Sequence, residues 1–512
     1  MDRVKNVGRN ALWGIISQIV MLGFPFIIRT IIIRTLGNEY LGLSSLFTSI
    51  LQVLNLTELG FSSAIVYSLY KPIIENDVDS VNALLAFFRK VYAIIGGIIL
   101  AVGLVLIPWL GAFIKKDIPA DINIQILYII YLINTSASYI LFAYKECVLV
   151  ANQRKDILSK ISTITKIVMY VFQVYILVVL KNFYLYVAVM PVLIITYSCL
   201  ISVAVSRLYP QYKKKGNITE EQKQSIKTQV SGLMISKIAA TTRNSFDNII
   251  ISSAIGLVAV TLYGNYYYII SSLQAIILIL ANSLQPGIGN CVATESIDKN
   301  YKDYRNFLFI YSWISGFCTV CLFTLYQPFM IIWVGDQNTL SNWIVILCTI
   351  YFYLLTMGDI SSLYINASGI WWNYRIKSVV ESISNLIMNI VLVHYFGIVG
   401  IIIATLVTRF VCGIIWGNLI LYRSYFGKNR TMKFYKDYFL YSLIVALSIG
   451  LIICIDKVLG RSSNELYVLK LLTCIIVPNL LYYFIYRKQD RYQTMMHYCS
   501  HLISIVLKGR KI

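Results

Sequence analysis

Long apolar runs alternate with short polar clusters along almost the whole chain. Most runs have about 20 residues, the length with which an α-helix crosses the hydrocarbon core of a bilayer. We therefore predict an all-α protein that crosses a membrane many times, through about fourteen transmembrane helices. The predicted spans cover residues 11–33, 40–67, 84–107, 122–150, 158–180, 184–205, 230–255, 258–284, 307–331, 343–365, 378–396, 398–422, 438–455 and 466–486.

The basic residues of the polar clusters predict the side of the membrane on which each loop lies. With a cytoplasmic N-terminus, the loops predicted to lie inside hold most of the 44 Lys and Arg residues. The outer segments hold only Arg34, Lys115, Lys116, Lys181, Lys457 and Arg461. Because cytoplasmic loops of membrane proteins are enriched in Lys and Arg, this bias predicts that both termini are cytoplasmic.

The longest polar stretch between spans, residues 207–229, divides the first twelve predicted spans into two groups of six. We predict an N-terminal six-helix bundle at 1–206, a basic cytoplasmic linker at 207–229 and a second six-helix bundle at 230–422. The last two membrane helices occupy 423–486, and a basic amphipathic tail at 487–512 lies on the cytoplasmic membrane surface. Residues 31–42 and 249–264 share an isoleucine triplet and two glycines, a weak internal repeat of the kind that transporters often contain.

The composition excludes several classes of protein. Only 13% of the residues are charged and 58% are hydrophobic, whereas a soluble chain carries about 25% charged residues. The net charge of +21 is explained by the topology of the loops, so we expect no binding of nucleic acid. Most of the ten cysteines lie in apolar segments and are expected to pack there as small hydrophobic residues, without a disulfide framework or a metal site. No phosphate-binding loop, zinc-protease motif or nucleophile elbow occurs, so we predict no catalytic residues.

The most informative residues are charges inside the predicted spans. Each costs roughly 2.5–3.5 kcal/mol at the centre of a span on insertion scales, so these side chains should face a cavity or one another. The cations without an acid at helical spacing, or near the middle of a span, are the candidates to line a cationic cavity: Arg29, Lys166, Lys237, Arg243 and Arg409. Arg243 could instead pair with Asp247 four residues later.

Acidic residues inside the spans have two interpretations. Glu58, Asp247 and Asp359 could bind a proton or cation, or could only neutralise the cations. Lys145, Glu146, Glu381 and Lys470 lie near span ends, where long side chains reach the interface, so a structural role is expected for them. Pro25, four residues before Arg29, is predicted to act as a hinge in the first span, although an irregularity of packing explains it equally well.

Two blocks of sequence resemble a known family. They are RTIIIRTLGNEYLGLSSLFTSILQVLNLTELGFSSAIVYSLYKP at 29–72 and SFDNIIISSAIGLVAVTLYGNYYYI at 245–269. Together with the arrangement of six spans, a basic linker, six spans and two more, they resemble the polysaccharide-type flippases of the multidrug/oligosaccharidyl-lipid/polysaccharide (MOP) exporter superfamily. The resemblance covers most of the chain.

The resemblance implies a fold and a function. The fold would be two six-helix bundles around a central cavity that opens alternately to each side of a bacterial plasma membrane. The cargo would be an oligosaccharide linked to polyprenyl pyrophosphate, moved from the inner to the outer leaflet for polysaccharide biosynthesis. In this family, cavity cations are thought to hold the pyrophosphate or acidic sugars, a role that fits Arg29, Arg243 and Arg409 best. Membrane lipids, a polysaccharide polymerase and glycosyltransferases would be the partners, with no cofactor and with H⁺ or Na⁺ as coupling ions.

Two alternatives differ from this hypothesis in their chemistry. A drug/cation antiporter of the MATE type, in the same superfamily, would need an acidic cavity, and the excess of intramembrane cations argues against it. A membrane enzyme of glycan assembly would need polar residues that converge at one membrane face, and such enzymes usually have a large external loop. The predicted outer loops are short, which argues against the enzyme.

Overall fold

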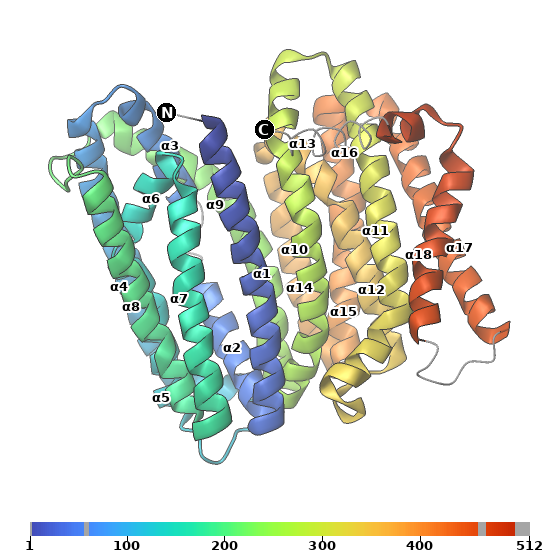
Figure 1. Ribbon diagram of the computed structural model, residues 1–512, viewed down its shortest axis with the longest axis horizontal. Coiled ribbons are helices and arrows are strands. Elements are labelled where there is room, and N and C mark those ends of the chain that lie inside the picture. The colour runs from blue at the N-terminus through green and yellow to red at the C-terminus, as the bar shows by residue number, and fades with distance from the viewer. Residues whose placement is uncertain (1–2, 56–60, 459–466, 497–512) are drawn as a thin grey trace. The chain divides into compact units, whose positions relative to one another are not determined.

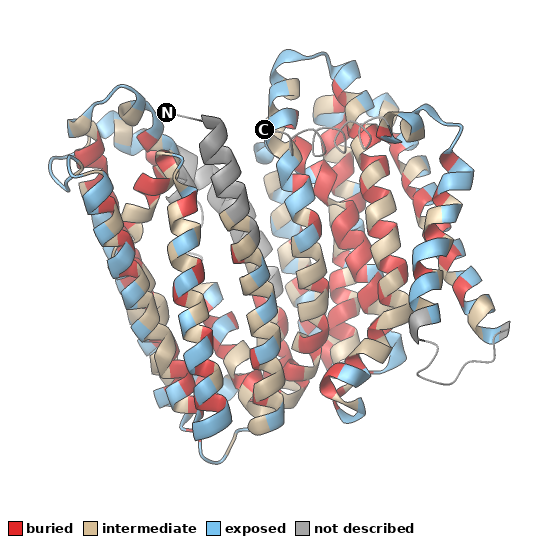
Figure 2. Ribbon diagram, viewed as in Figure 1, coloured by how far each residue is buried: buried red, intermediate tan, exposed pale blue. Residues whose placement is uncertain are grey.

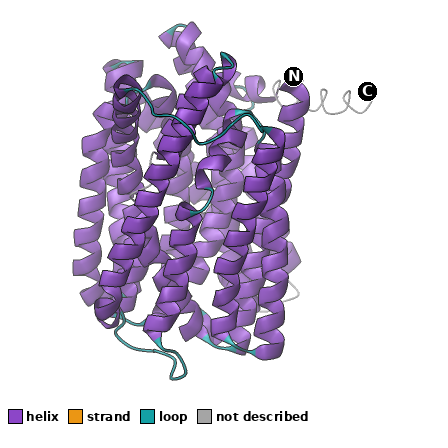
Figure 3. Ribbon diagram, turned by 90° about the vertical axis from the view of Figure 1, so that its left-hand side faces the viewer, coloured by secondary structure: helices purple, strands orange, loops and turns teal. Residues whose placement is uncertain are grey.

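The structure is a computed structural model, and it describes residues 3–55, 61–458 and 467–496. Every regular element in this described part is a helix, as Figure 3 shows. The helices in the first half of the chain, labelled in Figure 1, are α1 (Arg3–Thr35), α2 (Asn38–Leu54), α3 (Phe61–Ile74), α4 (Val78–Leu106), α5 (Ile124–Ile140), α6 (Ala143–Ala151), α7 (Lys155–Tyr175), α8 (Phe183–Leu208) and α9 (Glu220–Ala254).

The second half of the chain continues in the same way. Its helices are α10 (Leu257–Thr294), α11 (Ile297–Val334), α12 (Asn342–Met357), α13 (Asp359–Ser368), α14 (Trp371–Phe396), α15 (Ile398–Thr408), α16 (Gly417–Leu421), α17 (Thr431–Val458) and α18 (Tyr467–Tyr486). Short turns of tighter or wider helix extend several of them, among them η3 (Ile176–Leu180) after α7 and η5 (Arg409–Trp416) after α15.

The multi-span, all-helical architecture is confirmed. In the described part, eleven helical segments are long and apolar enough to cross a membrane, or twelve if the bent pair α5 and α6 forms one span. Each predicted segment overlaps at least one helix. The second, 40–67, covers α2 and α3 on either side of residues 56–60, and the seventh, 230–255, ends one residue after α9. The total of fourteen spans and the cytoplasmic location of both termini stay predictions.

The chain forms two compact units. The first comprises Met1–Gly264 with Asn389–Ile398, and the second comprises Asn265–Met388 with Val399–Ile512. The domain boundaries predicted from the sequence, including the linker and the C-terminal tail, stay predictions.

Small residues let helices of the first unit approach closely. At Gly96 of α4, an added Cβ atom would lie 3.2 Å from the carbonyl oxygen of Ser136 in α5. At Gly42 of α2, it would collide with the carbonyl of Leu257, at the start of α10. Glycine at such positions allows backbone-to-backbone packing that any larger residue prevents. A continuous apolar core, which includes Phe47, surrounds these contacts.

Two features of the first unit shape its interior. The axes of α5 and α6 meet at 48° across a break of a few residues, so what the sequence predicts as one span is bent. Helix α1, in contrast, is assigned as one continuous helix through Pro25. The hinge role of Pro25 stays a prediction.

The second unit is organised around α11, which contacts α12, α17 and α18. The rings of Trp313 on α11 and Tyr482 on α18 stack with centroids 5.4 Å apart, and the indole N–H donates to Asn479 at 2.7 Å. Much of α11 and most of α12 and α13 are buried, as the burial colours in Figure 2 show. Polar side chains on these helices are therefore held among fixed neighbours.

Candidate functional site

Arg29 is half-buried within the first unit, on α1. Its guanidinium lies against the backbone of Gly264, because a Cβ atom added there would be 3.1 Å from Nη2. It is also close enough to the Tyr186 hydroxyl on α8 for an electrostatic interaction. The absence of a side chain at Gly264 therefore leaves room for this cation among three helices of the same unit.

Asp247 is a buried carboxylate in the same unit, on α9. It accepts hydrogen bonds from the Tyr263 hydroxyl at 2.9 Å and from the Asn389 amide at 2.7 Å. Both donors are neutral, so these two bonds hold the carboxylate in place without cancelling its charge. The side chain of Arg243, the alternative partner suggested by spacing, lies outside the described residues.

Lys166 lines a cavity of about 420 Å³ among α5, α6, α7 and α8 of the first unit. Glu146 lines the same cavity, and the hydroxyl of Tyr197 forms a hydrogen bond with its carboxylate. No hydrogen bond or ion pair joins the Lys166 ammonium to any residue that the structure describes. The neighbouring Lys145, one residue before Glu146, instead donates to the hydroxyls of Ser202 and Ser206.

The second unit contains a buried network of charges around Arg409. One nitrogen of this guanidinium lies 3.9 Å from the Glu381 carboxylate, and another contacts the carbonyl oxygen of Leu355 at 3.5 Å. The Lys377 ammonium binds the other Glu381 oxygen at 2.5 Å. Asp359 accepts a hydrogen bond from Tyr311 at 2.9 Å and attracts Arg409. Two cations are thus matched by two carboxylates.

Local backbone structure positions Arg409. This residue begins the wide helical turn η5, where the helix is looser than an ordinary α-helix, a feature frequent at functional sites. Its side chain passes Gly413 and reaches Gly358, where added Cβ atoms would lie 3.2 Å from Cδ and 3.3 Å from Nη2. The two glycines therefore leave the space that the arginine occupies.

The structure brings together only some of the predicted site residues. Arg409 and Asp359 belong to one network in the second unit, and Lys166 lines a cavity in the first unit. Arg29 lies against Gly264, and Asp247 bonds to Tyr263, the preceding residue of the chain. Glu58 lies outside the described residues, as do the side chains of Lys237 and Arg243. Whether these residues bind a substrate or a coupling ion stays a prediction.

Helix α14 has a buried polar face that was not predicted from the sequence. Lys377, Glu381, Asn385 and Asn389 follow one another at intervals of four residues, and all four are buried. Asn385 donates to the hydroxyls of Thr405 and Thr408 at 3.3 and 3.4 Å. Because residues four apart lie on the same side of a helix, this spacing could have predicted the polar face from the sequence. Among the described residues, no group of three or more His, Cys, Asp or Glu side chains could hold a metal ion.

These features define a class: a membrane protein of many helical spans with charged and amide side chains buried between its helices. The chain belongs to the polysaccharide biosynthesis protein family, whose sequence model matches residues 7–292. The resemblance predicted from the two sequence blocks is thereby confirmed. A comparison with curated proteins finds no significant match.

Several solved structures have a similar fold. The lipid II flippase MurJ, in an inward closed conformation, is similar with a TM-score of 0.66 and 16% identity, over 93% of this chain and 98% of MurJ. An inward-facing multidrug resistance MATE family transporter gives 0.61 and 14%, over 79% and 94% of the two chains. The MATE transporter VcmN of Vibrio cholerae gives 0.60 and 13%, over 82% and 96%.

Proposed function

We propose that this protein is a flippase that moves oligosaccharides linked to polyprenyl pyrophosphate from the inner to the outer leaflet of a bacterial plasma membrane. Movement would proceed by alternating access, and the product would enter the synthesis of a surface polysaccharide. The family to which the chain belongs and the MurJ-like fold support this proposal.

The observation that carries the proposal is the position of Arg29. A half-buried guanidinium in a membrane unit is costly to insert, and the bare backbone of Gly264 leaves the space in which this cation lies. A pyrophosphate offers bidentate acceptor oxygens that match the planar donors of arginine. The polyprenyl tail would stay in the bilayer while Arg29 offsets the desolvation of the phosphates.

The charge network of the second unit suits a different role. Because Glu381 and Asp359 already neutralise Lys377 and Arg409, this network offers little net attraction to a phosphate. In a network whose charges balance, binding of a proton or a cation weakens one ion pair. The remaining charged side chains then form different pairs. We propose that Asp359, and Asp247 in the first unit, take part in coupling to H⁺ or Na⁺.

A MATE-type exporter of cationic drugs is the second candidate, and the fold alone permits it. The Lys166 ammonium argues against it, because no described residue bonds to this charge and it would repel a cationic cargo. Efflux of a cationic dye from cells that express the protein would support the antiporter. We expect no such efflux.

The experiment uses the full chain in vesicles that contain a fluorescent oligosaccharide linked to polyprenyl pyrophosphate. A membrane-impermeant reagent that destroys fluorescence in the outer leaflet measures the rate of flipping. Replacing Arg29 with Gln removes a charged hydrogen-bonding group, whose loss typically costs about 1.5–3 kcal/mol, or roughly 10- to 150-fold. The matched control is Arg34→Gln on the same helix, an exposed arginine whose loss should change little.

The flipping rates that support the proposal differ from the rate that refutes it. The proposal is supported if the wild type and Arg34→Gln flip the lipid-linked saccharide and Arg29→Gln flips it slowly. Partial recovery of the rate in Arg29→Lys would support it further. A wild-type protein in sealed vesicles that flips no more lipid-linked saccharide than protein-free vesicles would refute it.

A further inference from the structure

The interface between α11 and α18 in the second unit has a regular register. The rings of Phe309 and Tyr486 have centroids 4.8 Å apart, and one turn further along, Trp313 and Tyr482 stack at 5.4 Å. The Tyr482 hydroxyl also donates to the carbonyl oxygen of Ser312 at 3.0 Å. Because one residue number rises by four while the other falls by four, the two helices are antiparallel and pair one residue per turn.

The same register brings two cysteines together. It places Cys321 of α11 opposite Cys474 of α18, two turns beyond the stacked rings. The two thiols do lie within hydrogen-bonding distance of each other. Gly316 lets the helices approach closely, because an added Cβ atom there would lie 3.0 Å from the Tyr482 hydroxyl oxygen. A disulfide requires Cβ atoms about 3.5–4.5 Å apart, so close packing of this kind is a precondition for one.

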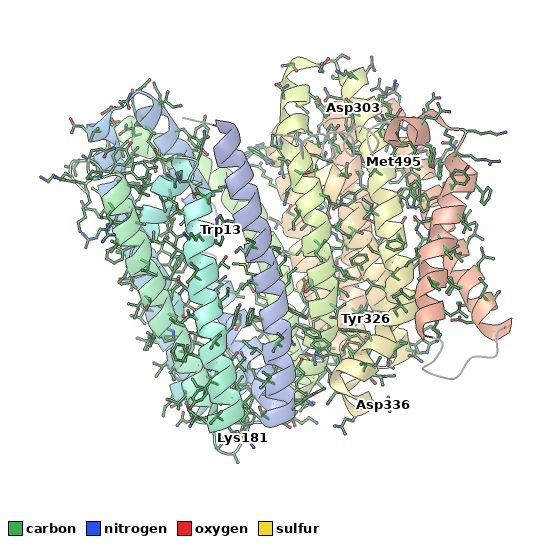
Figure 4. All side chains as sticks on the ribbon, in the orientation of Figure 1. Trp13, Lys181, Asp303, Tyr326, Asp336 and Met495 are labelled. Atoms are coloured by element: carbon green, nitrogen blue, oxygen red, sulfur yellow. The ribbon has the colours of Figure 1, made fainter. Side chains whose placement is uncertain are left out.

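The surroundings of this cysteine pair are apolar. The Cys474 side chain is fully buried. Cys321 lines a cavity of about 300 Å³ together with apolar and aromatic side chains of α10 and α11, among them Leu273, Phe317 and Tyr326, which Figure 4 labels. Both cysteines also lie near the middle of the spans predicted at 307–331 and 466–486. Charged reagents therefore reach the pair poorly, whereas a small apolar molecule that dissolves in the bilayer can enter the cavity.

Cys318 is the competing partner for Cys321, because it lies three residues earlier on α11 and lines the same cavity. The Cβ atoms of residues three apart in an α-helix are separated by about 5–6 Å. This separation exceeds the length that a disulfide spans, so a link within α11 would distort the helix. Cys474 instead faces Cys321 across the interface, where the two thiols are already in contact.

We propose that Cys321 and Cys474 form a reversible disulfide that joins α18 to α11, and that the oxidant is a small apolar two-electron acceptor dissolved in the bilayer. Two S–H bonds break and one S–S bond forms, with the release of two electrons and two protons. Dioxygen takes up both and becomes hydrogen peroxide, and a quinone becomes the quinol in the same way. In the oxidised protein, α18 can then no longer separate from α11. This proposal is independent of the proposed function.

The test uses the full-length protein in lipid nanodiscs that hold one copy each, so that no disulfide joins two copies. Dioxygen, with copper(II) 1,10-phenanthroline as catalyst, is the oxidant, and dithiothreitol reverses the reaction. Remaining thiols are alkylated in denaturant, and mass spectrometry of the unreduced peptides identifies the linked cysteines. The variants are Cys321→Ser and Cys474→Ser, and the control is Cys318→Ser on the same helix. Unfolding temperatures of the reduced proteins check that each variant folds.

We expect oxidation of the wild type to consume two of its ten thiols and to link Cys321 to Cys474. Cys318→Ser should form the same link, and the other two variants should not form it. The oxidised wild type should unfold at a higher temperature than the reduced protein, because a cross-link restricts the unfolded chain. Dithiothreitol should reverse this rise, and Cys321→Ser and Cys474→Ser should not show it. Oxidised glutathione, which is charged and stays in water, should form the link much more slowly.

The proposal is overturned if no link between Cys321 and Cys474 forms, or if Cys321 links to Cys318 instead. A link that leaves the unfolding temperature unchanged would refute its role in holding α18 against α11. Equal rates with oxidised glutathione and with dioxygen would show that the thiols are reached from water, and would refute the apolar route of the oxidant.

Discussion

The ammonium of Lys377 lies 2.5 Å from the carboxylate of Glu381, one helical turn later on α14, and both side chains are almost fully buried. The same carboxylate also faces Arg409. Removing one partner of a buried ion pair leaves an uncompensated charge, which typically costs 3–5 kcal/mol. We therefore expect Glu381→Gln to lower the free energy of unfolding by about this amount. Thermal or denaturant unfolding of the purified protein in a lipid environment measures it.

A compensating variant makes this prediction specific. In the double variant Lys377→Met/Glu381→Gln, the network again has one cation, Arg409, and one carboxylate, Asp359. Its stability should recover part of the loss, because a buried pair can be replaced by neutral groups at little cost. A double variant that is less stable than Glu381→Gln alone would contradict the assignment of these charges as one network.

The hydrogen bond from Tyr263 to Asp247 gives a second prediction. Tyr263→Phe removes one neutral donor from a buried carboxylate, and hydrogen bonds to charged groups contribute about 1.5–3 kcal/mol. We expect the variant to unfold at lower temperature or lower denaturant concentration. The control is Tyr128→Phe in the same unit, since the Tyr128 hydroxyl is buried and has no hydrogen-bond partner among described residues. If both variants are destabilised equally, the loss of stability comes from changed packing and not from the hydrogen bond to Asp247.

The sequence predicted the helices much better than it predicted the neighbours of the charged residues. Apolar runs of span length locate α4, α7 or α17 because the bilayer sets their length. The same pattern gives the depth of a residue but not the direction in which it points. Glu381, near the start of its predicted span, was expected to reach the interface, yet it is buried between Lys377 and Arg409.

Two other features of the site required the three-dimensional structure. The bend between α5 and α6 has no proline within it, so the apolar run 122–150 predicts one straight span. Without the bend, Asn134 and Glu146 could not be assigned to one cavity. The pairing of Asp247 with Tyr263 and Asn389 joins residues up to 142 positions apart, and no local pattern predicts such a contact.

The space beside Arg29 gives a third prediction. In Gly264→Ala, the new methyl group would lie 3.1 Å from the guanidinium, so the end of the arginine side chain must shift. Helical propensity favours alanine over glycine by about 1 kcal/mol, so the fold should tolerate the change. Flipping of the lipid-linked saccharide should nevertheless slow several-fold, because the cation no longer lies where the phosphate would meet it. Gly287→Ala is the control on the same helix, since no atom lies within 4 Å of its added Cβ. Unchanged flipping in Gly264→Ala would remove Arg29 from the binding role.

The last prediction concerns the effect of the membrane potential on the charged cargo and on the cations of the protein. A pyrophosphate headgroup with roughly two negative charges gains about 2.3 kcal/mol per charge when it leaves a cell interior at −100 mV. The cargo should therefore accumulate in the outer leaflet when vesicles are made negative inside, by a potassium gradient with valinomycin. Clamping the potential at zero should abolish this accumulation, unless an ion gradient replaces it.

The effect of potential on the rate, rather than on the final distribution, depends on the protein's own cations. If Arg29 binds the pyrophosphate, it compensates one of the roughly two negative charges while the loaded carrier crosses the membrane. Arg29→Gln removes this compensation, so the potential should accelerate loaded crossing more strongly in this variant. Single-turnover flipping, in which no return step occurs, should therefore depend more steeply on the potential in Arg29→Gln than in the wild type. An equal dependence in both proteins would show that Arg29 does not move with the cargo.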